Sequence, residues 1–335
     1  MSTDKKNGGL GSCRAQSAID STSSAGAEPS TFTEEVFTNA MEGDMASLQA
    51  IPKADCHAHG ILSAPFASYQ RILDRVIKEP PKSFQGFEPF GVFISNVIFP
   101  IDSLSKTIQI LKAAIEFMIT DGVVLTQLSF DIRLFYNQDK QAVIEALSKL
   151  IETYKESIKV SFDLGVPREI LDDILISQLK EVIEYKFFRT VDFYGNESFK
   201  LSEAHYQLIE YLRVKEVKVK LHWGEQGSGL LDELGRAKPD AIQHGIELAR
   251  VPFQENLKQV PLHVCPASNI ALNYVKNYKE HPISALQKIG YTVTLGSDDY
   301  ALFGASLSQQ YLKLYQTGNF SIEDLEHIRK NGLRC

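Results

Sequence analysis

The chain has 335 residues, of which 44% are hydrophobic and 23% are charged, and a formal net charge of -7. These values indicate a folded protein with a full core, built as one large α/β barrel or as two smaller domains. The negative charge argues against nucleic acid or an anionic membrane as the main partner, because both bind clusters of cations.

No segment marks the chain for secretion or for a membrane. No apolar run approaches the roughly 18–20 residues of a membrane span, and no apolar segment follows Lys5 and Lys6, as it would in a secretory signal. The cysteines lack paired metal-binding spacing and are scattered over the chain: Cys13, Cys56, Cys265 and Cys335. A disulfide framework is therefore not expected, and we predict a protein of a reducing compartment, the cytoplasm.

Residues 1–32 differ in composition from the rest of the chain. They are rich in Ser, Gly and Ala, and their first aromatic side chain is Phe32. Such a segment buries too little apolar surface to offset the entropy lost on ordering. We therefore predict a flexible tail over residues 1–32 and a folded domain over residues 33–335, which opens with a helix from Thr33 to Ala50.

Short strand-like runs alternate with segments of helical period. The strand candidates are Lys53–His57, Gly122–Phe130, Lys159–Leu164, Phe187–Phe193, Val217–His222, Ala241–His244, Pro261–Cys265 and Tyr291–Ser297. In the last predicted helix, Ser321 and Asp324 have the spacing of a capping box. Strands that alternate with helices pair in parallel, and eight of them favour closure into a (β/α)8 TIM-type barrel. The alternative is an open, doubly wound sheet.

The connection after the first strand, about residues 61–105, is unusually long and carries several phenylalanines. They are Phe66, Phe84, Phe87, Phe90, Phe93 and Phe99. A connection of this length is usually functional. We predict that it forms a helical lid that lines a pocket for a planar apolar group; the alternative is a separate hydrophobic cluster under a long loop.

Polar side chains stand at the ends of four strand candidates. They are His57 and His59 at the first, His222 and Glu225 at the fifth, His244 at the sixth, and Asp298 and Asp299 at the eighth. In a barrel the carboxyl ends of the strands converge on one mouth, where the chemistry lies. His57 and His59 are two residues apart and therefore face the same side of a strand. Core packing does not explain so many polar groups at converging strand ends.

Imidazole and carboxylate ligands together suit Zn²⁺ best, with Fe²⁺ or Mn²⁺ as alternatives. Four side chains would bind one ion: His57, His59, His222 and Asp298. A water in the fifth position would have its pKa lowered by Zn²⁺ towards about 7. No Lys ends a strand candidate where it could bridge a second ion, so we predict one Zn²⁺ per chain. Glu225 is then the natural general acid and His244 the natural partner of the water.

These residues resemble the adenosine deaminases and their adenine-deaminating relatives within the amidohydrolase superfamily. Those proteins carry His-x-His after strand 1, His-Ala-Gly-Glu after strand 5, His-Gly after strand 6 and Asp-Asp after strand 8. All four elements occur here in the same order. In addition, Val264–Asn269 resembles their Val-Cys-Pro-x-Ser-Asn segment, and Val191–Glu197 resembles their Asp-Leu-x-Gly-x-Glu segment. The resemblance runs from about Ile51 to the last residue of the sequence.

The resemblance implies a role for each site residue. The four side chains named above would bind Zn²⁺, with His59 also beside the substrate. Glu225 would share a proton with purine N1 and so activate C6, and His244 would orient and deprotonate the attacking water. Asp299 would hydrogen-bond N7, and the backbone of Gly195 would lie near N3. Loss of ammonia would then leave a 6-oxopurine.

Three positions depart from the family pattern. Ile61 stands where the family has a polar residue that contacts the sugar or purine, which places the ribose contact of ordinary adenosine deaminases in question. Trp223 replaces the small residue of His-Ala-Gly-Glu, and Tyr300 replaces the Pro after Asp-Asp. None of these changes removes a catalytic atom, but each bears on what the pocket accepts.

We therefore predict hydrolytic deamination of a 6-aminopurine, with adenosine or deoxyadenosine as the leading substrate. Adenine and N6-substituted adenine nucleosides or nucleotides are the alternatives within this chemistry. A different metal-dependent hydrolase acting on an amide or ester is a second class, against which the Glu225 and Asp299 pair argues. A non-catalytic binding protein is a third class, and the presence of every ligand and acid–base residue argues against it.

Overall fold

The computed structural model describes residues 31–99, 101–227 and 231–335. Thr31–Cys335 form one compact unit. The predicted tail, residues 1–32, lies outside the described residues except for its last two. Of these, Phe32 is buried, and its ring contacts those of Phe37 and Tyr311. The compact unit therefore begins slightly before the predicted domain boundary.

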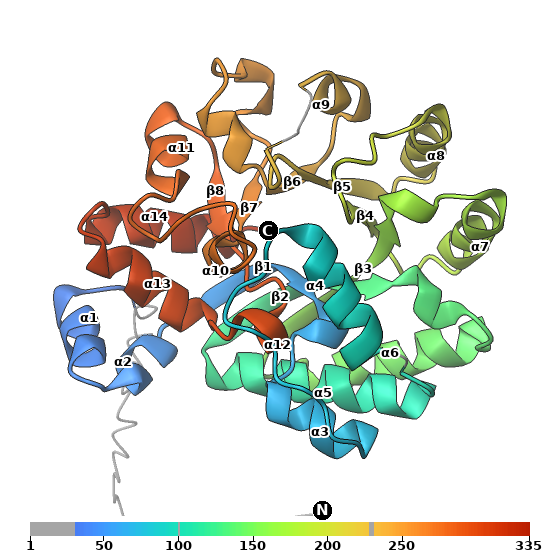
Figure 1. Ribbon diagram of the computed structural model, residues 1–335, viewed down its shortest axis with the longest axis horizontal. Helices are drawn as coiled ribbons and strands as arrows, with labels where there is room; N and C mark the ends of the chain where they lie inside the picture. Colours follow the sequence, from blue (N-terminus) through green and yellow to red (C-terminus); the bar gives the residue numbers. More distant parts are fainter. Residues whose placement is uncertain (1–30, 100, 228–230) are drawn as a thin grey trace, which may run out of the picture. The chain divides into compact units, whose positions relative to one another are not determined.

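Eight parallel strands form one sheet and follow each other in sequence order (Figure 1). Their bounds are β1 Lys53–His59, β2 Val123–Asp131, β3 Lys159–Pro167, β4 Thr190–Tyr194, β5 Lys218–Trp223, β6 Ala241–His244, β7 Leu262–Val264 and β8 Val293–Leu295. The sheet closes where Ala58 forms a parallel bridge with Asp298, just beyond β8. There the Asp298 N–H donates to the His57 carbonyl at 2.9 Å. The predicted barrel is confirmed, and the open sheet is wrong.

Helices surround the strands, which lie at the centre of Figure 1. Their bounds are α1 Glu34–Met41, α2 Met45–Gln49, α3 Phe66–Leu73, α4 Phe87–Phe93, α5 Leu104–Thr120, α6 Lys140–Tyr154, α7 Asp173–Glu184, α8 Glu203–Val214, α9 Leu231–Ala237, α10 Pro266–Ala271, α11 Ile283–Ile289, α12 Tyr300–Phe303, α13 Leu307–Gln316 and α14 Ile322–Gly332. Shorter helical turns are η1 Gly60–Leu62, η2 Ile94–Ile98, η3 Ile132–Phe135, η4 Arg168–Ile170, η5 Ile246–Ala249 and η6 Glu255–Leu257. Within the described ranges, no helix combines the length and the apolar character needed to cross a bilayer.

Side-chain caps fix where several helices begin. Asp139 accepts a hydrogen bond from the N–H of Ala142 at the start of α6 at 2.7 Å, which satisfies one of the unpaired amide groups of the first turn. At the start of α14 the predicted capping box of Ser321 and Asp324 is present. The single helix predicted from Thr33 to Ala50 is wrong. It is divided into α1 and α2 at Gly43, whose φ of 107° an α-helix cannot contain.

Charged and polar side chains occupy part of the barrel interior. Lys220 of β5 is buried, and its Nζ lies 2.5 Å from Asp163 Oδ2 of β3 and 2.5 Å from Gln127 Oε1 of β2. The same Nζ contacts the Cys56 carbonyl of β1 at 3.4 Å. A buried ammonium is tolerated only when it is paired in this way. These contacts tie four strands together beneath the mouth.

The long connection between β1 and β2 contains η1, α3, α4 and η2 before α5 begins. Ring contacts join Phe84 to Phe90 and Phe93, and Phe90 stacks on Phe303 of α12 at a centroid distance of 5.5 Å. Phe87, Phe90 and Phe99 also line the cavity at the barrel mouth. The connection therefore agrees with both predictions, because its aromatic side chains form a hydrophobic cluster and also line a pocket.

Candidate active site

The barrel mouth brings together five of the polar side chains identified in the sequence. His57 and His59 come from β1, His222 comes from β5, His244 ends β6, and Asp298 follows β8. The ring of His57 lies 4.7 Å from that of His222 and 4.7 Å from that of His244, measured between centroids. Asp298 Oδ1 lies 3.4 Å from His59 Nε2 and 3.8 Å from His57 Nε2. All five side chains therefore face a common point.

This group has the composition and spacing of a metal site. Ligand atoms of His57, His222 and His244 lie within 4.8 Å of one another, as do those of His57, His59 and Asp298. Nε2 of His57 and Nε2 of His222 are buried without a hydrogen-bond partner, which costs free energy unless a cation accepts their lone pairs. Burial, together with the neighbouring imidazoles, lowers the pKa of His57 and His244 well below the usual value. Both rings are therefore neutral, the form that binds a metal.

The backbone holds this group in an unusual conformation. His244 and Asp298 have φ values of 64° and 58°, in the left-handed region that side chains other than glycine rarely adopt. Such residues cluster at functional sites, where the surrounding structure offsets their strain. Asp55 supports the turn around Asp298, because its Oδ1 accepts hydrogen bonds from the backbone of Ser297 at 3.1 Å and of His57 at 3.4 Å.

Glu225 is buried beside the histidine group. Its Oε1 lies 3.6 Å from His244 Nδ1, and its backbone N–H donates to Glu197 Oε1 at 3.0 Å. Burial raises the pKa of Glu225 well above the usual value, and the nearby carboxylates of Asp298 and Glu197 raise it further. Its surroundings therefore favour the protonated carboxyl group, the form that can donate a proton.

A hydrogen-bonded chain links the Glu225 carboxyl to the ring of His244. Ser268 Oγ donates to Glu225 Oε1 at 3.3 Å. Asn269 Nδ2 lies 3.5 Å from the same oxygen and 3.3 Å from His244 Nδ1. Behind it, His281 Nε2 lies 3.1 Å from Asn269 Oδ1. All these groups are buried, so the carboxyl and the imidazole have a fixed relative position.

Asp299 and Gly195 both line the cavity next to this group. Oδ1 of Asp299 is buried without a hydrogen-bond partner. Burial, with the carboxylates of Asp298 and Glu225, raises the pKa of Asp299 well above the usual value. Gly195 has a φ of 110°, and a Cβ at this position would overlap the Glu169 carboxylate. Glycine is therefore required here, and its backbone is exposed to whatever fills the cavity.

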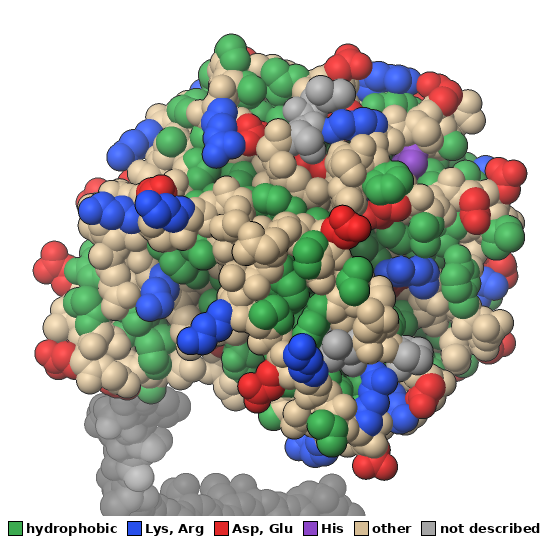
Figure 2. Space-filling view, in the orientation of Figure 1, with side chains coloured by type: hydrophobic (Ala, Val, Ile, Leu, Met, Phe, Trp, Pro, Cys, Tyr) green, Lys and Arg blue, Asp and Glu red, His purple; other side chains and the backbone are tan. Residues whose placement is uncertain are grey.

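The cavity at the mouth has a volume of about 360 Å³ and mixed apolar and polar walls. Its apolar wall includes Ile61, Leu62, Phe87, Phe90, Ile94, Phe99, Pro167, Ile170 and Leu272. Hydrophobic side chains also appear on the outer surface in the region of α4 (Figure 2), where Val92 is 55% exposed. Among the three departures from the family pattern, only Ile61 is on the wall described here. Trp223 is buried elsewhere, and Tyr300 stacks on Phe117 at 4.1 Å.

Comparison with known proteins places these features in a family. The family model described as adenosine deaminase matches residues 176–335. A putative adenosine/adenine deaminase of Treponema pallidum is 29% identical over 282 residues, which cover 80% of this chain and 92% of that protein. Over most of its length the chain is similar to the adenosine and adenine deaminases. This similarity identifies the chain as an aminohydrolase of the deaminase type.

Solved structures share the fold of this deaminase. The adenine deaminase from Arthrobacter aurescens superimposes with a TM-score of 0.75 at 18% identity, covering 84% of this chain and 93% of that one. An amidohydrolase from Burkholderia ambifaria with bound Zn also has a TM-score of 0.75, at 13% identity, covering 87% of this chain and 86% of that one.

The deaminase has further polar groups on the cavity wall that sequence analysis missed. Arg133 donates to both oxygens of Asp131, and the Tyr194 hydroxyl donates to Asp131 Oδ2 at 2.6 Å. Ser129 and Glu169 line the same wall. Ser129 and Asp131 are at the carboxyl end of β2, so their place at a strand end was the available signal. β2 and β3 carry neither a histidine nor one of the family segments, the two features that distinguish the other strand ends in the sequence.

Proposed function

We propose that this chain catalyses the hydrolytic deamination of a 6-aminopurine, with adenosine or deoxyadenosine as the leading substrate. One observation carries the proposal: a buried Glu225, whose pKa is raised by burial, and a histidine–aspartate group of metal-binding composition meet at one cavity. That pairing supplies a proton donor and a water-activating centre at the same point, which hydrolysis of an aromatic amine requires.

His57, His59, His222 and Asp298 would hold a single Zn²⁺. The two unpartnered Nε2 atoms and the neutral state of His57 support this assignment. When bound, Zn²⁺ supplies Lewis-acid chemistry that makes water a nucleophile near neutral pH. The family's metal dependence and the zinc in the Burkholderia ambifaria amidohydrolase favour zinc over iron or manganese.

The chain's own acid and base carry the proton transfers. Glu225 donates its proton towards purine N1, which withdraws electron density from C6. His244 accepts a proton from the water that attacks C6, and the resulting tetrahedral carbon carries both the new oxygen and the amino group. His244 then passes its proton to the amino group, which leaves as ammonia. The new C6 hydroxyl returns a proton to Glu225, and the product is a 6-oxopurine. Asp299, whose Oδ1 has no protein partner, is placed to hydrogen-bond N7.

The cavity wall bears on the choice of purine. Ile61 cannot form the polar contact that the resemblance associates with the sugar, which favours adenine as the second candidate. Asp131, Arg133 and Tyr194 bring hydroxyl-binding groups to another part of the wall, which supports a nucleoside. The volume of about 360 Å³ is within the range of small-molecule sites.

Ammonia release from a panel of substrates tests the proposal. Zinc-loaded protein is incubated with adenosine, deoxyadenosine, adenine, adenosine monophosphate and N6-methylated forms, alongside amide and ester substrates. We expect the highest kcat/KM for adenosine or deoxyadenosine. Turnover of amides with no turnover of any 6-aminopurine would contradict the proposal.

A further inference from the structure

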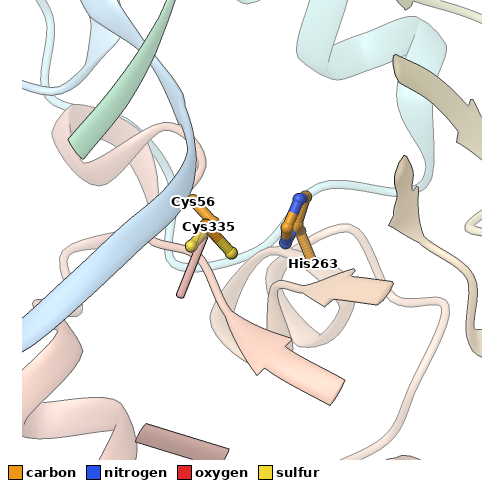
Figure 3. A group of neighbouring side chains, drawn as sticks. All are labelled: Cys56, His263 and Cys335. Atoms are coloured by element: carbon orange, nitrogen blue, oxygen red, sulfur yellow. The ribbon is translucent and has the colours of Figure 1, made fainter. Parts of the chain in front are cut away.

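A second group of metal-binding side chains lies outside the catalytic group. Cys56 of β1, His263 of β7 and Cys335 beyond α14 bring one sulfur, one nitrogen and one sulfur within 4.8 Å of one another. Figure 3 shows the two cysteine side chains adjacent to each other, with the imidazole of His263 beside them. Sequence spacing gave no sign of this group, because more than 70 residues separate each member from the next. The barrel alone brings them together.

We propose that Cys56, His263 and Cys335 bind a second, structural metal ion of the thiolate-preferring class, with Zn²⁺ as the leading candidate. In tetrahedral zinc sites the Zn–S distance is about 2.3 Å and the Zn–N distance about 2.0 Å, so neighbouring ligand atoms are about 3.5–3.8 Å apart. The three atoms lie within 4.8 Å of one another, so movements of about 1 Å would bring them to this spacing. Thiolate with imidazole is the ligand set that selects Zn²⁺ over Mg²⁺ or Ca²⁺.

The surroundings hold each ligand in place. His263 is buried, and its Nδ1 lies 2.7 Å from Thr294 Oγ1, a contact that orients the ring and leaves Nε2 for a metal. Cys56 is fully buried, and its Sγ lies 3.5 Å from the Gly332 carbonyl at the end of α14. Asn331 anchors the same end to β8 through a hydrogen bond of 3.1 Å from its Nδ2 to the Val293 carbonyl.

Charge balance favours a divalent ion at this position. Two metal-bound thiolates and one Zn²⁺ have a total charge of zero. The neighbouring buried ion pair of Lys220 and Asp163 is also neutral, and its ammonium lies 3.4 Å from the Cys56 carbonyl. A neutral assembly avoids the large cost of an uncompensated charge in the interior.

The position suggests a structural purpose. Leu333 and Cys335 pack against Ala54, Cys56 and Leu125, which form a small apolar cluster separate from the main core. A metal bound to Cys56, His263 and Cys335 would fasten the segment after α14 to β1 and β7. Because β1 also carries His57 and His59, the ion would brace the strand from which two catalytic ligands extend.

Cobalt substitution separates this site from the catalytic one. The full chain with Cys13→Ser is reduced, stripped of metal and titrated with Co²⁺ alone, and bound cobalt and thiolate-to-cobalt absorption are measured. We expect two ions per chain and a thiolate band, because the proposed catalytic ligands include no sulfur. Cys335→Ser should lose the band and one ion. Cys265→Ala should keep the band, which excludes as its source the thiol that lies 3.3 Å from His57 Nδ1. Asp298→Ala should weaken the other ion and leave the band unchanged.

Zinc X-ray absorption of the protein without site variants covers the case in which a variant fails to fold. We expect sulfur neighbours at about 2.3 Å for half of the bound zinc. The proposal is overturned if only one ion binds with nitrogen and oxygen neighbours, if the thiolate band survives Cys335→Ser, or if thiol titration shows a disulfide between Cys56 and Cys335 in place of metal binding. A failure of deaminase activity would leave the cobalt and sulfur signals unaffected, so the two proposals fail separately.

Discussion

Glu225 Oε1 and His244 Nδ1 lie 3.6 Å apart at the barrel mouth, one at the end of β5 and the other at the end of β6. These strands are hydrogen-bonded neighbours, and their register pairs Trp223 with His244. The proposed acid and the proposed base are therefore positioned by adjacent strands of one rigid sheet. Catalytic groups held in this way need little reorganisation as the reaction proceeds.

Replacing Glu225 tests the proposed acid. Glu225→Ala removes the proton donor and should lower kcat by at least about 100-fold, by the usual magnitude of general acid–base catalysis. Steady-state kinetics with adenosine measure the change, and zinc analysis checks that the metal remains bound. An unchanged kcat in a folded, zinc-loaded variant would show that another group protonates the purine.

The raised pKa of Glu225 predicts a pH profile for the reaction. The carboxyl must be protonated to act as an acid, so kcat/KM should hold steady near neutral pH and fall as pH rises through the raised pKa. Glu225→Gln should remove this alkaline limb while retaining the fold. A wild-type profile that rises with pH through the neutral range would contradict a protonated Glu225.

Replacing Asn269 should lower activity although Asn269 itself takes no part in the proton transfers. Its amide lies between Glu225 and His244, so Asn269→Ala should free both side chains and lower kcat by about 10- to 100-fold. The matched control is Asn277→Ala, because that amide lies at the surface beside Glu280 at 2.9 Å. Equal activities of the two variants would exclude a positioning role for Asn269.

Replacing Ile61 by a polar residue should change the substrate preference. Ile61→Asn returns a polar group to the cavity wall, and one added hydrogen bond of about 0.5–1.5 kcal/mol should raise kcat/KM for adenosine roughly 2- to 10-fold. The value for adenine, which has no sugar, should rise less. An equal rise for both substrates would show that this position does not contact the sugar.

Replacing Lys53, at the end of β1 away from the active site, should strongly reduce the stability of the fold. Its buried Nζ donates to the carbonyls of Leu48 at 2.9 Å, Ile51 at 2.8 Å and Asp121 at 2.6 Å. Lys53→Met removes all three of these charge-assisted hydrogen bonds and leaves the Ile51 carbonyl without its donor, while the carbonyls of Leu48 and Asp121 keep the Ile51 N–H and the Ser308 hydroxyl. The variant should lower the free energy of unfolding by about 3 kcal/mol. Urea unfolding measures the loss, and exposed Lys112→Met should change stability by less than about 0.5 kcal/mol. Equal stabilities would refute this account of Lys53.

The barrel was predictable because its signals are local. Short strand-like runs marked all eight strands, with bounds within three residues of those observed. The largest shift at a strand start is in β4, which begins at Thr190 rather than Phe187, because the rings of Phe187 and Phe188 pack with other aromatics. The break at Gly43 was missed because the apolar period continues across it, and only the backbone conformation interrupts the helix.

The site was predictable in part for the same reason. Histidines and carboxylates at strand ends are visible in the sequence, and the barrel rule brings them to one mouth. The partner of each side chain depends on distances across the barrel, so the placing of Asn269 between Glu225 and His244 needed coordinates. The meeting of Cys56 with Cys335 likewise depends on where α14 ends against β1.

The central claim is that water replaces the 6-amino group of a purine at this cavity. The most direct measurement is mass spectrometry of the product formed from adenosine by zinc-loaded protein in ¹⁸O-labelled water, with ammonia quantified in the same sample. We predict inosine carrying one labelled oxygen and an equal amount of ammonia. Fully zinc-loaded protein that yields no labelled 6-oxopurine from adenosine or from any other 6-aminopurine would contradict the claim.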